Sequence, residues 1–240
     1  MEVNPIDMWR QSAGAWIADQ GEEGDASRRI ILDPALEPFR STLSGKRVLD
    51  LGCGEGRYAR KMKAAGALVT GVDPVPEFIE RARQLDPAGD YRVCRAEELP
   101  LEAHSFDVVL SYLTLMDVED YVRAGREMVR VLAPGGRILL VLISNLTSCS
   151  EGWIKDAEGN RLFRPVDRYM EEFSMNLEWR GIRIVNYHRP LSAILKVFLS
   201  QGCVLTDFIE PLPPADHPWH AEEHRAPNFQ ILELMKLPLA

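Results

Sequence analysis

The stretch that decides the fold is "VLDLGCGEGR", residues Val48–Arg57. Its first four residues are typical of a buried strand, and the amphipathic segment 57–66 that follows is typical of a helix. Three glycines, Gly52, Gly54 and Gly56, stand between them. Glycine adopts unusual dihedral angles and lets the backbone approach a ligand, while the start of a helix offers free N–H groups. The stretch therefore predicts a strand, a tight turn and a helix, with a ligand at the turn.

Apolar and amphipathic segments alternate along the chain from Lys46 onward. We expect strands at 47–52, 67–73, 90–96, 106–113, 137–144 and 203–210, and helices at 57–66, 76–85, 119–132 and 190–202. The segment 228–236 is expected to be a last strand at the sheet edge. This alternation predicts an α/β fold, with a mostly parallel sheet covered by helices on both faces. Ligands of such sheets bind outside the carboxyl ends of the strands.

We interpret residues 1–240 as a single domain with four parts. A helical leader is expected over 1–45, a ligand-binding core over 46–144, an insert that forms a lid after the fifth strand over 145–189, and a C-terminal helix with the sheet edge over 190–240. The insert carries turn signals and no long apolar strand.

Composition excludes several classes of function. The 240 residues are 46% hydrophobic, which suits a compact globule, and the net charge of −8 is a poor match to nucleic acid phosphates. No apolar run has the length of a membrane span, and residues 1–11 do not resemble a signal peptide. The four cysteines lack CxxC spacing, which indicates reduced thiols and a cytoplasmic protein.

Asp73 narrows the ligand to a nucleoside. It lies 21 positions after Gly52, at the end of the second strand, where an acid accepts the hydroxyl groups of a ribose. A dinucleotide fingerprint would have glycine at Arg57, and the carboxylates of Asp50 and Glu55 do not suit a pyrophosphate. They do suit S-adenosylmethionine, which carries a sulfonium and an ammonium group and no phosphate.

Four segments in order, "VLDLGCGEGRYA", "VTGVDPVPEFIERAR", "RAEELPLEAHSFDVVLSYLTLMDVED" and "REMVRVLAPGGRILLV", resemble the motifs of class I S-adenosylmethionine-dependent methyltransferases. The resemblance covers residues 46–144 and is nearest to the branch that includes quinone-biosynthesis and other small-molecule methyltransferases. It implies a Rossmann-like sheet of seven strands with the last strand antiparallel. The cofactor-binding residues that it implies are Asp50, Gly52, Cys53, Gly54, Asp73, Pro74, Ala96, Glu97, Ser111, Tyr112 and Leu113.

The chain departs from this branch at two places. Cys94-Arg95-Ala96 stands where the family often has Gly-Asp-Ala, so the usual aspartate contact to adenine is missing, and backbone groups or Glu97 are the candidates to replace it. Leu115-Met116-Asp117 stands where the family often has Leu-His-His. Asp117 is thereby expected, by resemblance, to face the site of methyl transfer.

The proton of an oxygen or nitrogen nucleophile needs an acceptor, and two residues are candidates for this general base. His188 ends the insert just before a helix, and its ordinary pKa suits a base at neutral pH. The competing interpretation is a histidine that packs in the lid and bonds a backbone carbonyl. Asp117 is the rival base. Arg189 is a candidate anchor for an anionic group, or a surface arginine paired with an acid.

Aromatic residues gather in the leader and the insert. Trp9, Trp16, Trp153 and Tyr187 are candidate walls around a flat or apolar acceptor, or a small separate core, or a mixture of the two. The insert is also rich in arginine, which indicates either an anionic acceptor or a solvated face balanced by Glu171, Glu172 and Glu178. His220 and His224 have helical spacing, but no cysteine joins them, and we expect no metal.

The sequence therefore predicts methyl transfer from S-adenosylmethionine to a small molecule, at oxygen or nitrogen, by in-line displacement. A module that binds the cofactor without catalysis remains an alternative, as does a methyltransferase that acts on protein or RNA. The acceptor is expected to be aromatic or anionic, and the protein to act as a monomer or homodimer without nucleic acid or membrane partners.

Overall fold

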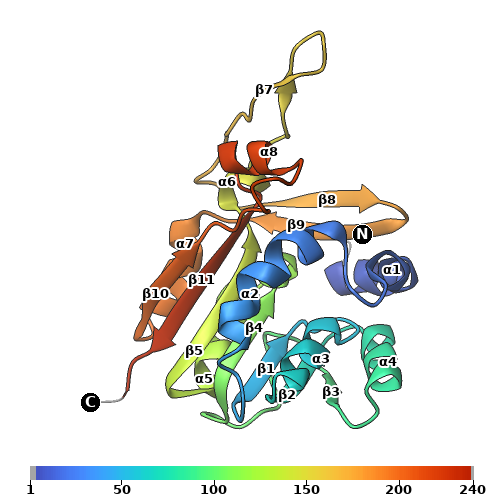
Figure 1. The fold of residues 1–240 in the computed structure, drawn as a ribbon. Helices are drawn as coiled ribbons and strands as arrows, with labels where there is room; N and C mark the ends of the chain where they lie inside the picture. Colours follow the sequence, from blue (N-terminus) through green and yellow to red (C-terminus); the bar gives the residue numbers. More distant parts are fainter. Residues whose placement is uncertain (1–3, 239–240) are drawn as a thin grey trace.

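A computed structural model describes residues 4–238, and its main feature is one seven-stranded sheet (Figure 1). The strand order is β10-β11-β5-β4-β1-β2-β3, and β11 runs antiparallel to both of its neighbours. The strands of this sheet are β1 (Arg47–Leu51), β2 (Leu68–Asp73), β3 (Asp90–Val93), β4 (Phe106–Tyr112), β5 (Leu132–Ile143), β10 (Cys203–Ile209) and β11 (Phe229–Lys236). The predicted Rossmann-like α/β fold with an antiparallel last strand is confirmed.

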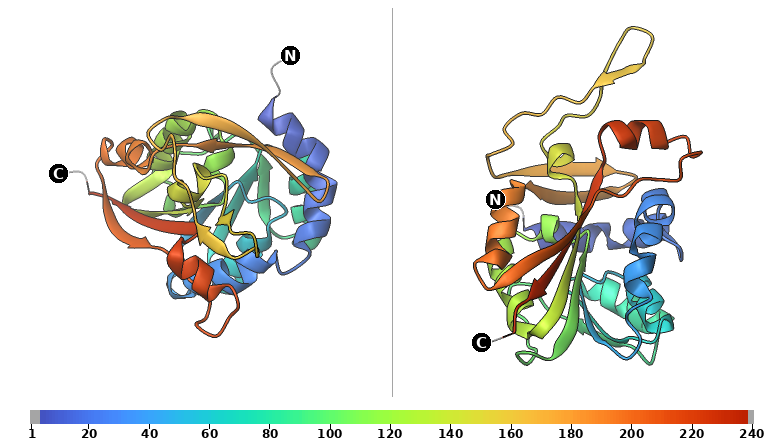
Figure 2. Two further views of the ribbon diagram at one scale, coloured as in Figure 1. Left: turned by 90° about the horizontal axis from the view of Figure 1, so that it is seen from above. Right: turned by 60° about the vertical axis from the view of Figure 1, so that its left-hand side comes forward.

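Helices cover both faces of the sheet (Figure 2). The helical elements are α1 (Pro5–Gln20), η1 (Arg28–Leu32), α2 (Asp33–Arg40), α3 (Arg57–Ala64), α4 (Pro76–Leu85), η2 (Leu115–Asp117), α5 (Tyr121–Val131), α6 (Asn145–Ser148), α7 (Leu191–Leu199) and α8 (His220–Arg225). Among residues 4–238, none of these helices has the length and apolar character needed to cross a membrane.

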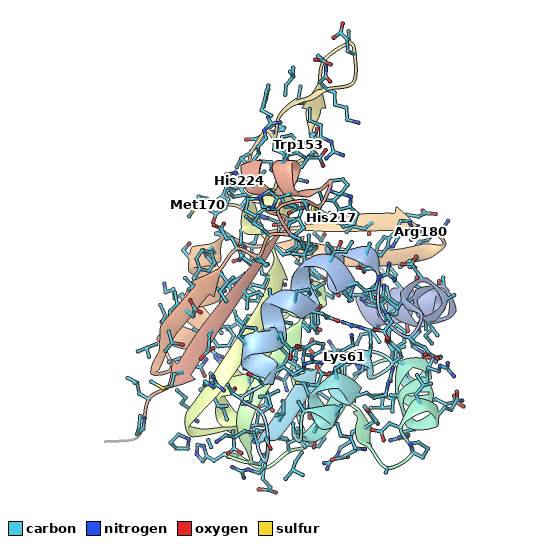
Figure 3. The ribbon with its side chains drawn as sticks, viewed as in Figure 1. Lys61, Trp153, Met170, Arg180, His217 and His224 are labelled. Carbon is cyan, nitrogen blue, oxygen red and sulfur yellow. The ribbon has the colours of Figure 1, made fainter. Side chains whose placement is uncertain are left out.

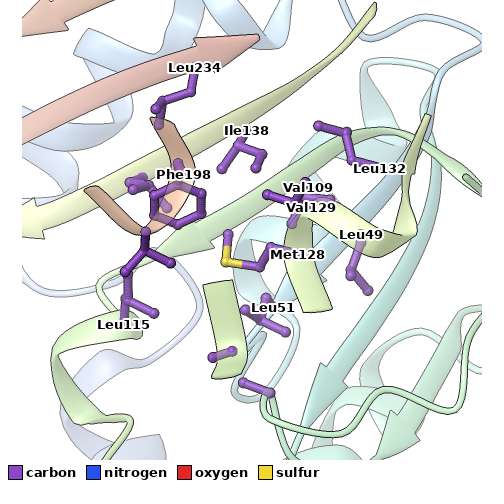
Figure 4. Packing of buried hydrophobic residues seen from close by; sticks show 14 of the residues in the cluster. Leu49, Leu51, Val109, Leu115, Met128, Val129, Leu132, Ile138, Phe198 and Leu234 are labelled. Carbon is purple, nitrogen blue, oxygen red and sulfur yellow. The ribbon is translucent and has the colours of Figure 1, made fainter. Parts of the chain in front are cut away.

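The two cores follow from the alternation of side chains along the strands. Leu49, Val109 and Ile138 point to the face packed by α5 and α7, where Met128 and Phe198 fill the centre (Figure 4). The neighbouring strand positions point to the other face, against η1, α2 and α3. Both faces are dry, so the strands read as nearly continuous apolar runs.

Two predictions about strands were wrong in detail. β11 is not at the sheet edge; it lies between β5 and β10, and its Leu232 and Leu234 are fully buried. β10 is the edge strand, which explains why its Leu205 and Phe208 are each 42% exposed. The third strand ends at Val93 rather than at residue 96, because the chain turns there toward the ligand-binding end of the sheet.

The insert after β5 contains two hairpins. β6 (Ile154–Lys155) pairs with β7 (Arg161–Phe163) in an arm that projects from the body (Figure 2). β8 (Phe173–Trp179) pairs with β9 (Ile182–His188), and this second hairpin crosses above the sheet beside α1 (Figure 1).

A buried serine fixes α1 to the second hairpin. The hydroxyl of Ser12, 2% exposed, donates to the carbonyl of Arg183 and accepts from its N–H, both at 2.8 Å. Arg180 adds an ion pair to Asp19 at 2.7 Å. The Ser12 side chain thus satisfies both backbone groups of Arg183, as a neighbouring strand would. Helix α1 and the β8–β9 hairpin are therefore joined, and we call them together the roof.

We expect Ser12→Ala to lower the free energy of unfolding by about 1–3 kcal/mol, because two backbone groups of Arg183 lose their partner. Denaturant titration measures the change. Ser41→Ala is the matched control, since Ser41 bonds one carbonyl at an exposed helix end. Equal effects of the two substitutions would contradict the assigned role of Ser12.

Candidate functional site

A cavity of about 880 Å³ opens at the carboxyl ends of β1 to β4, under the roof of α1 and the β8–β9 hairpin. We call it the cofactor cavity. Binding sites for small molecules typically measure about 300–1,000 Å³, so the space suits a cofactor together with a small acceptor. Its position is the one expected for a sheet of this topology.

The glycine loop forms the floor of the cofactor cavity. Gly52 has a φ of +71°, and a Cβ on it would meet the side chain of Thr114 at 2.1 Å. Gly54 has a φ of +54°, and a Cβ there would have no neighbour within 4 Å among the described residues. Gly52 is thus needed for the packing of Thr114, whereas Gly54 leaves open space for a ligand to approach the backbone.

Asp73 is held at the end of β2 by the loop itself. Its carboxylate accepts the N–H of Gly54 at 3.0 Å and that of Val75 at 2.9 Å. Burial raises the pKa of Asp73 to about 7, and the charge of Glu55 adds to the rise, against the two backbone hydrogen bonds. The carboxylate is therefore fixed in orientation and keeps lone pairs for the two hydroxyl groups of a ribose.

Asp50 is the other acid at the floor. It is 2% exposed, and its Oδ2 has no hydrogen-bond partner within residues 4–238. Burial raises the pKa of Asp50 to about 7; Asp73 and Glu55 add to the rise and Arg57 opposes it. An unpartnered carboxylate that lines a cavity is costly unless a ligand satisfies it. A cationic group fits this site, and S-adenosylmethionine carries two.

Arg57, which stands where a dinucleotide fingerprint would have glycine, has a structural role. Its guanidinium makes two hydrogen bonds to Asp33, at 2.6 and 3.1 Å, and Asp33 also accepts the hydroxyl of Tyr112 at 2.9 Å. Since Asp33 begins α2, the pair ties the leader to the glycine loop. The same bonds occupy the hydroxyl of Tyr112, so that its ring, not its oxygen, faces the cofactor cavity.

Most of the predicted cofactor-binding residues line the cofactor cavity. They are Asp50, Gly52, Cys53, Gly54, Asp73, Pro74, Ala96, Glu97, Tyr112 and Leu113. Ser111 is not among the lining residues found in the described chain: it is fully buried, and alternation along β4 points it away from the face of Tyr112. Sequence reasoning missed Arg28, Thr114, Asn176 and Asn186, which also line the cavity.

His188 lies away from the cofactor cavity. Its ring is fully buried between Tyr169 and Phe173, Nε2 lies 2.9 Å from the carbonyl of Tyr169, and Nδ1 lies 2.7 Å from the hydroxyl of Ser148. Nε2 is the donor to the Tyr169 carbonyl, and Nδ1 is hydrogen-bonded to Ser148. With both nitrogens occupied in the hairpin, its position does not support the prediction of a general base and favours the packing interpretation.

Arg189 and Trp153 also lie outside the lining of the cofactor cavity in the described chain. The guanidinium of Arg189 is buried between the rings of Tyr121 and Tyr187 and donates to the carbonyls of Leu115, Val118 and Glu119. It is a brace for η2 rather than an anchor for an acceptor. Trp153 lies near α8, against Arg161, Arg164 and Arg225 (Figure 3).

Asp117 does face the cofactor cavity, at the end of η2. Its Oδ1 accepts a hydrogen bond from the side-chain amide of Asn186 on β9. Burial raises the pKa of Asp117 well above its usual range; the charge of Asp73 adds to the rise, whereas Asn186, Arg28 and Arg189 oppose it. A carboxyl group with a raised pKa in a cavity is typical of a functional site.

The aromatic residues of the leader serve both interpretations. Trp9 and Trp16 line the cofactor cavity, and they also pack edge to face at 5.1 Å. Trp9 contacts Phe78 of α4, and Trp16 contacts Trp179 of β8. Tyr187 lines the cavity from β9. Trp9 and Trp16 therefore belong to a small hydrophobic core and also form part of the wall of the cofactor cavity.

The arginines of the insert are balanced by acids. Arg168 pairs with Glu171 at 2.7 Å, and Arg183 pairs with Glu178 at 3.1 Å. Glu172 accepts the hydroxyl of Tyr121. The arrangement favours a solvated face over a site for an anionic acceptor.

His220 and His224 lie 5.9 Å apart between ring centroids. Within residues 4–238, no group of three or more potential metal ligands is found.

Comparisons with known proteins agree on one family. The family described as "Methyltransferase domain" matches residues 49–140. The solved structure of an S-adenosylmethionine-dependent methyltransferase from Mesorhizobium loti is 30% identical, with a TM-score of 0.77 over 90% of this chain and 100% of that one.

Two curated relatives add information about the class of reaction. A malonyl-[acyl-carrier protein] O-methyltransferase of Erwinia billingiae is 33% identical over 177 residues, 73% of this chain. The match spans 66% of that relative, just under two thirds of its length. A ubiquinone biosynthesis O-methyltransferase of Xanthomonas oryzae is 40% identical over 106 residues, 42% of this chain and 44% of the relative.

Asp73→Ala is expected to weaken the binding of S-adenosylhomocysteine by about 10- to 100-fold, because hydrogen bonds to a charged group are worth about 1.5–3 kcal/mol. Isothermal titration measures it. Asp90→Ala, on the neighbouring strand at the surface, is the matched control and should bind normally. Unchanged affinity of Asp73→Ala would overturn the ribose assignment.

The affinity for S-adenosylmethionine should fall as the pH falls below about 7. Burial raises the pKa of both Asp50 and Asp73 to about 7, so both carboxylates take up protons as the pH falls below that value. A protonated Asp50 no longer attracts a cation, and a protonated Asp73 accepts the ribose hydroxyls less well. Titrations at pH 8 and pH 6 compare the dissociation constants. Asp50→Asn should bind more weakly at pH 8 and depend less on pH; an unchanged pH dependence in this variant would exclude Asp50 as the group responsible.

Proposed function

Because the chain belongs to the class I S-adenosylmethionine-dependent methyltransferases, we propose that it methylates an oxygen or nitrogen atom of a small molecule, with Asp117 as the acceptor of the nucleophile's proton. The observation that carries the proposal is the position of Asp117: it lines the same cavity as Asp50 and Asp73, on the segment that follows β4.

The floor of the cofactor cavity supplies the binding groups. In this proposal Asp73 accepts the ribose hydroxyls, which its fixed orientation supports, and Asp50 receives a cationic group of the cofactor, which its unpartnered oxygen supports. Bound S-adenosylmethionine supplies an electrophilic methyl group on a sulfonium sulfur. The protein then has to hold the acceptor atom behind that methyl group and to limit the access of water, and the position of α1 and the β8–β9 hairpin over the cavity supports this role.

Asp117 suits the role of base for two reasons. Asn186 donates to one of its oxygens, which fixes the carboxylate and leaves the other oxygen for the acceptor. Its raised pKa brings it nearer to that of a hydroxyl or amine whose proton it must take. The proton passes to Asp117 as the acceptor's lone pair forms the new bond.

Oxygen is the preferred acceptor atom, since both curated relatives described above are named O-methyltransferases. A small acceptor is favoured over RNA by the carboxyl groups of Asp50, Asp73 and Asp117 in the cofactor cavity, which repel phosphates. The four cysteines are all free thiols, which supports a cytoplasmic protein.

Asp117→Asn is expected to lower the rate of product formation by about 10²- to 10⁴-fold, the usual contribution of a general base. The variant should bind S-adenosylhomocysteine with nearly normal affinity. The assay incubates the protein with S-adenosylmethionine and a panel of phenols, alcohols and amines and detects methylated products by mass spectrometry.

Asp120→Asn is the control for that substitution, because Asp120 caps α5 and asparagine caps helices equally well. His188→Asn should keep turnover within about tenfold while lowering the melting temperature, since the ring packs in the hairpin. Full activity of Asp117→Asn would remove the proposed base, and a selective loss of turnover in His188→Asn would restore the histidine as a candidate.

A further inference from the structure

We infer that the acceptor carries an uncharged aromatic ring and places it in a second cavity behind the cofactor cavity, which we call the inner pocket. This inference rests on the proposed function and specifies its substrate class. The inner pocket measures about 220 Å³ and is walled by Leu115, Leu142, Met175 and Ile194. It shares Met116 and Asn186 with the cofactor cavity, so the two spaces adjoin.

The size of the inner pocket matches one substituted ring. An apolar cavity of about 150 Å³ takes up benzene, and 220 Å³ leaves room for a ring with one or two substituents. Two of the walls are methionines, Met116 and Met175, whose flexible thioether side chains adapt to aromatic faces and contact them favourably.

Most polar side chains in the walls hydrogen-bond to other parts of the protein, and the guanidinium of Arg189 adds a positive charge to the lining. The guanidinium of Arg189 donates to three backbone carbonyls. The side chain of Asn145 donates to the carbonyl of Arg189 and accepts from Gln230, and Ser148 bonds His188. A cationic group would meet the like charge of Arg189, and an anionic group would have to compete with three carbonyls for that guanidinium, whereas an uncharged ring needs neither a counter-charge nor a hydrogen bond in this pocket.

The boundary between the two cavities places a ring next to the proposed base. Asn186 lines both spaces, and its amide is bonded to Asp117. A ring in the inner pocket therefore directs a hydroxyl or amino substituent toward Asp117 and into the cofactor cavity. The inner pocket accordingly sets both the specificity for the ring and the orientation of its nucleophilic atom.

The test titrates 4-fluorophenol into the protein loaded with S-adenosylhomocysteine and labelled with ¹³C at the methionine methyl groups. Met175 lines the inner pocket but is not found in the lining of the cofactor cavity, Met116 lines both, and Met170 is 73% exposed. We expect the signals of Met175 and Met116 to shift together and that of Met170 to stay. A shift of Met116 without Met175, or no shift at all, would overturn the inner pocket as the ring site.

The variant Met175→Phe provides a second test of the inner pocket. A phenyl group added to a cavity of this size should weaken 4-fluorophenol binding by about tenfold or more and leave the affinity for S-adenosylhomocysteine within about twofold. Met170→Phe, the same change on the exposed loop, should alter neither. Equal 4-fluorophenol affinity in Met175→Phe and wild type would refute the inference while the proposed function stands. Failure of the wild-type protein to bind S-adenosylhomocysteine would refute both.

Discussion

The buried carboxyl groups of Asp50 and Asp73, which both line the cofactor cavity, are the constraint on which the rest of the structure depends. Burial raises the pKa of each to about 7, and the charge of Asp73 disfavours ionisation of both Asp50 and Asp117. The glycine loop does not neutralise them: it gives Asp73 one N–H, from Gly54, beside that of Val75, and it leaves one oxygen of Asp50 without a partner in residues 4–238. Such a site stores electrostatic free energy that a cationic ligand releases on binding.

The surrounding elements keep this site closed and in register. Arg57 ties the leader to the loop through Asp33, and Ser12 ties α1 to the hairpin. The hairpin in turn reaches the reacting end through Asn186, which bonds Asp117. The roof is thus coupled to the proposed base through the Asn186 amide and, next to β9, through Arg189, which bonds the carbonyls around η2. Movement of the hairpin would change both water access and the orientation of the Asp117 carboxylate.

The fold and the cofactor site were predictable from the sequence because their determinants are local. The glycine spacing, the acid at Asp73 and the alternation of strands and helices all lie within short segments. The position of β11 was not predictable this way, since its place between β5 and β10 depends on pairings distant in sequence. The packing of His188 was not predictable for the same reason: the register of β8 against β9 sets it opposite Phe173 and outside the lining of the cofactor cavity found in residues 4–238. Asn186 carried no motif, and only the folded hairpin brings it to Asp117.

Proton release on cofactor binding tests the central claim most directly. Calorimetric titration of S-adenosylmethionine near pH 7, repeated in buffers of different ionisation enthalpy, counts the protons exchanged. If a cationic group of the cofactor binds beside Asp50 and the ribose hydroxyls donate to Asp73, binding should release protons, and Asp50→Asn should release fewer than the wild-type protein. Binding with no proton release, or with the same release in Asp50→Asn, would contradict a cavity built around unpaired carboxylates.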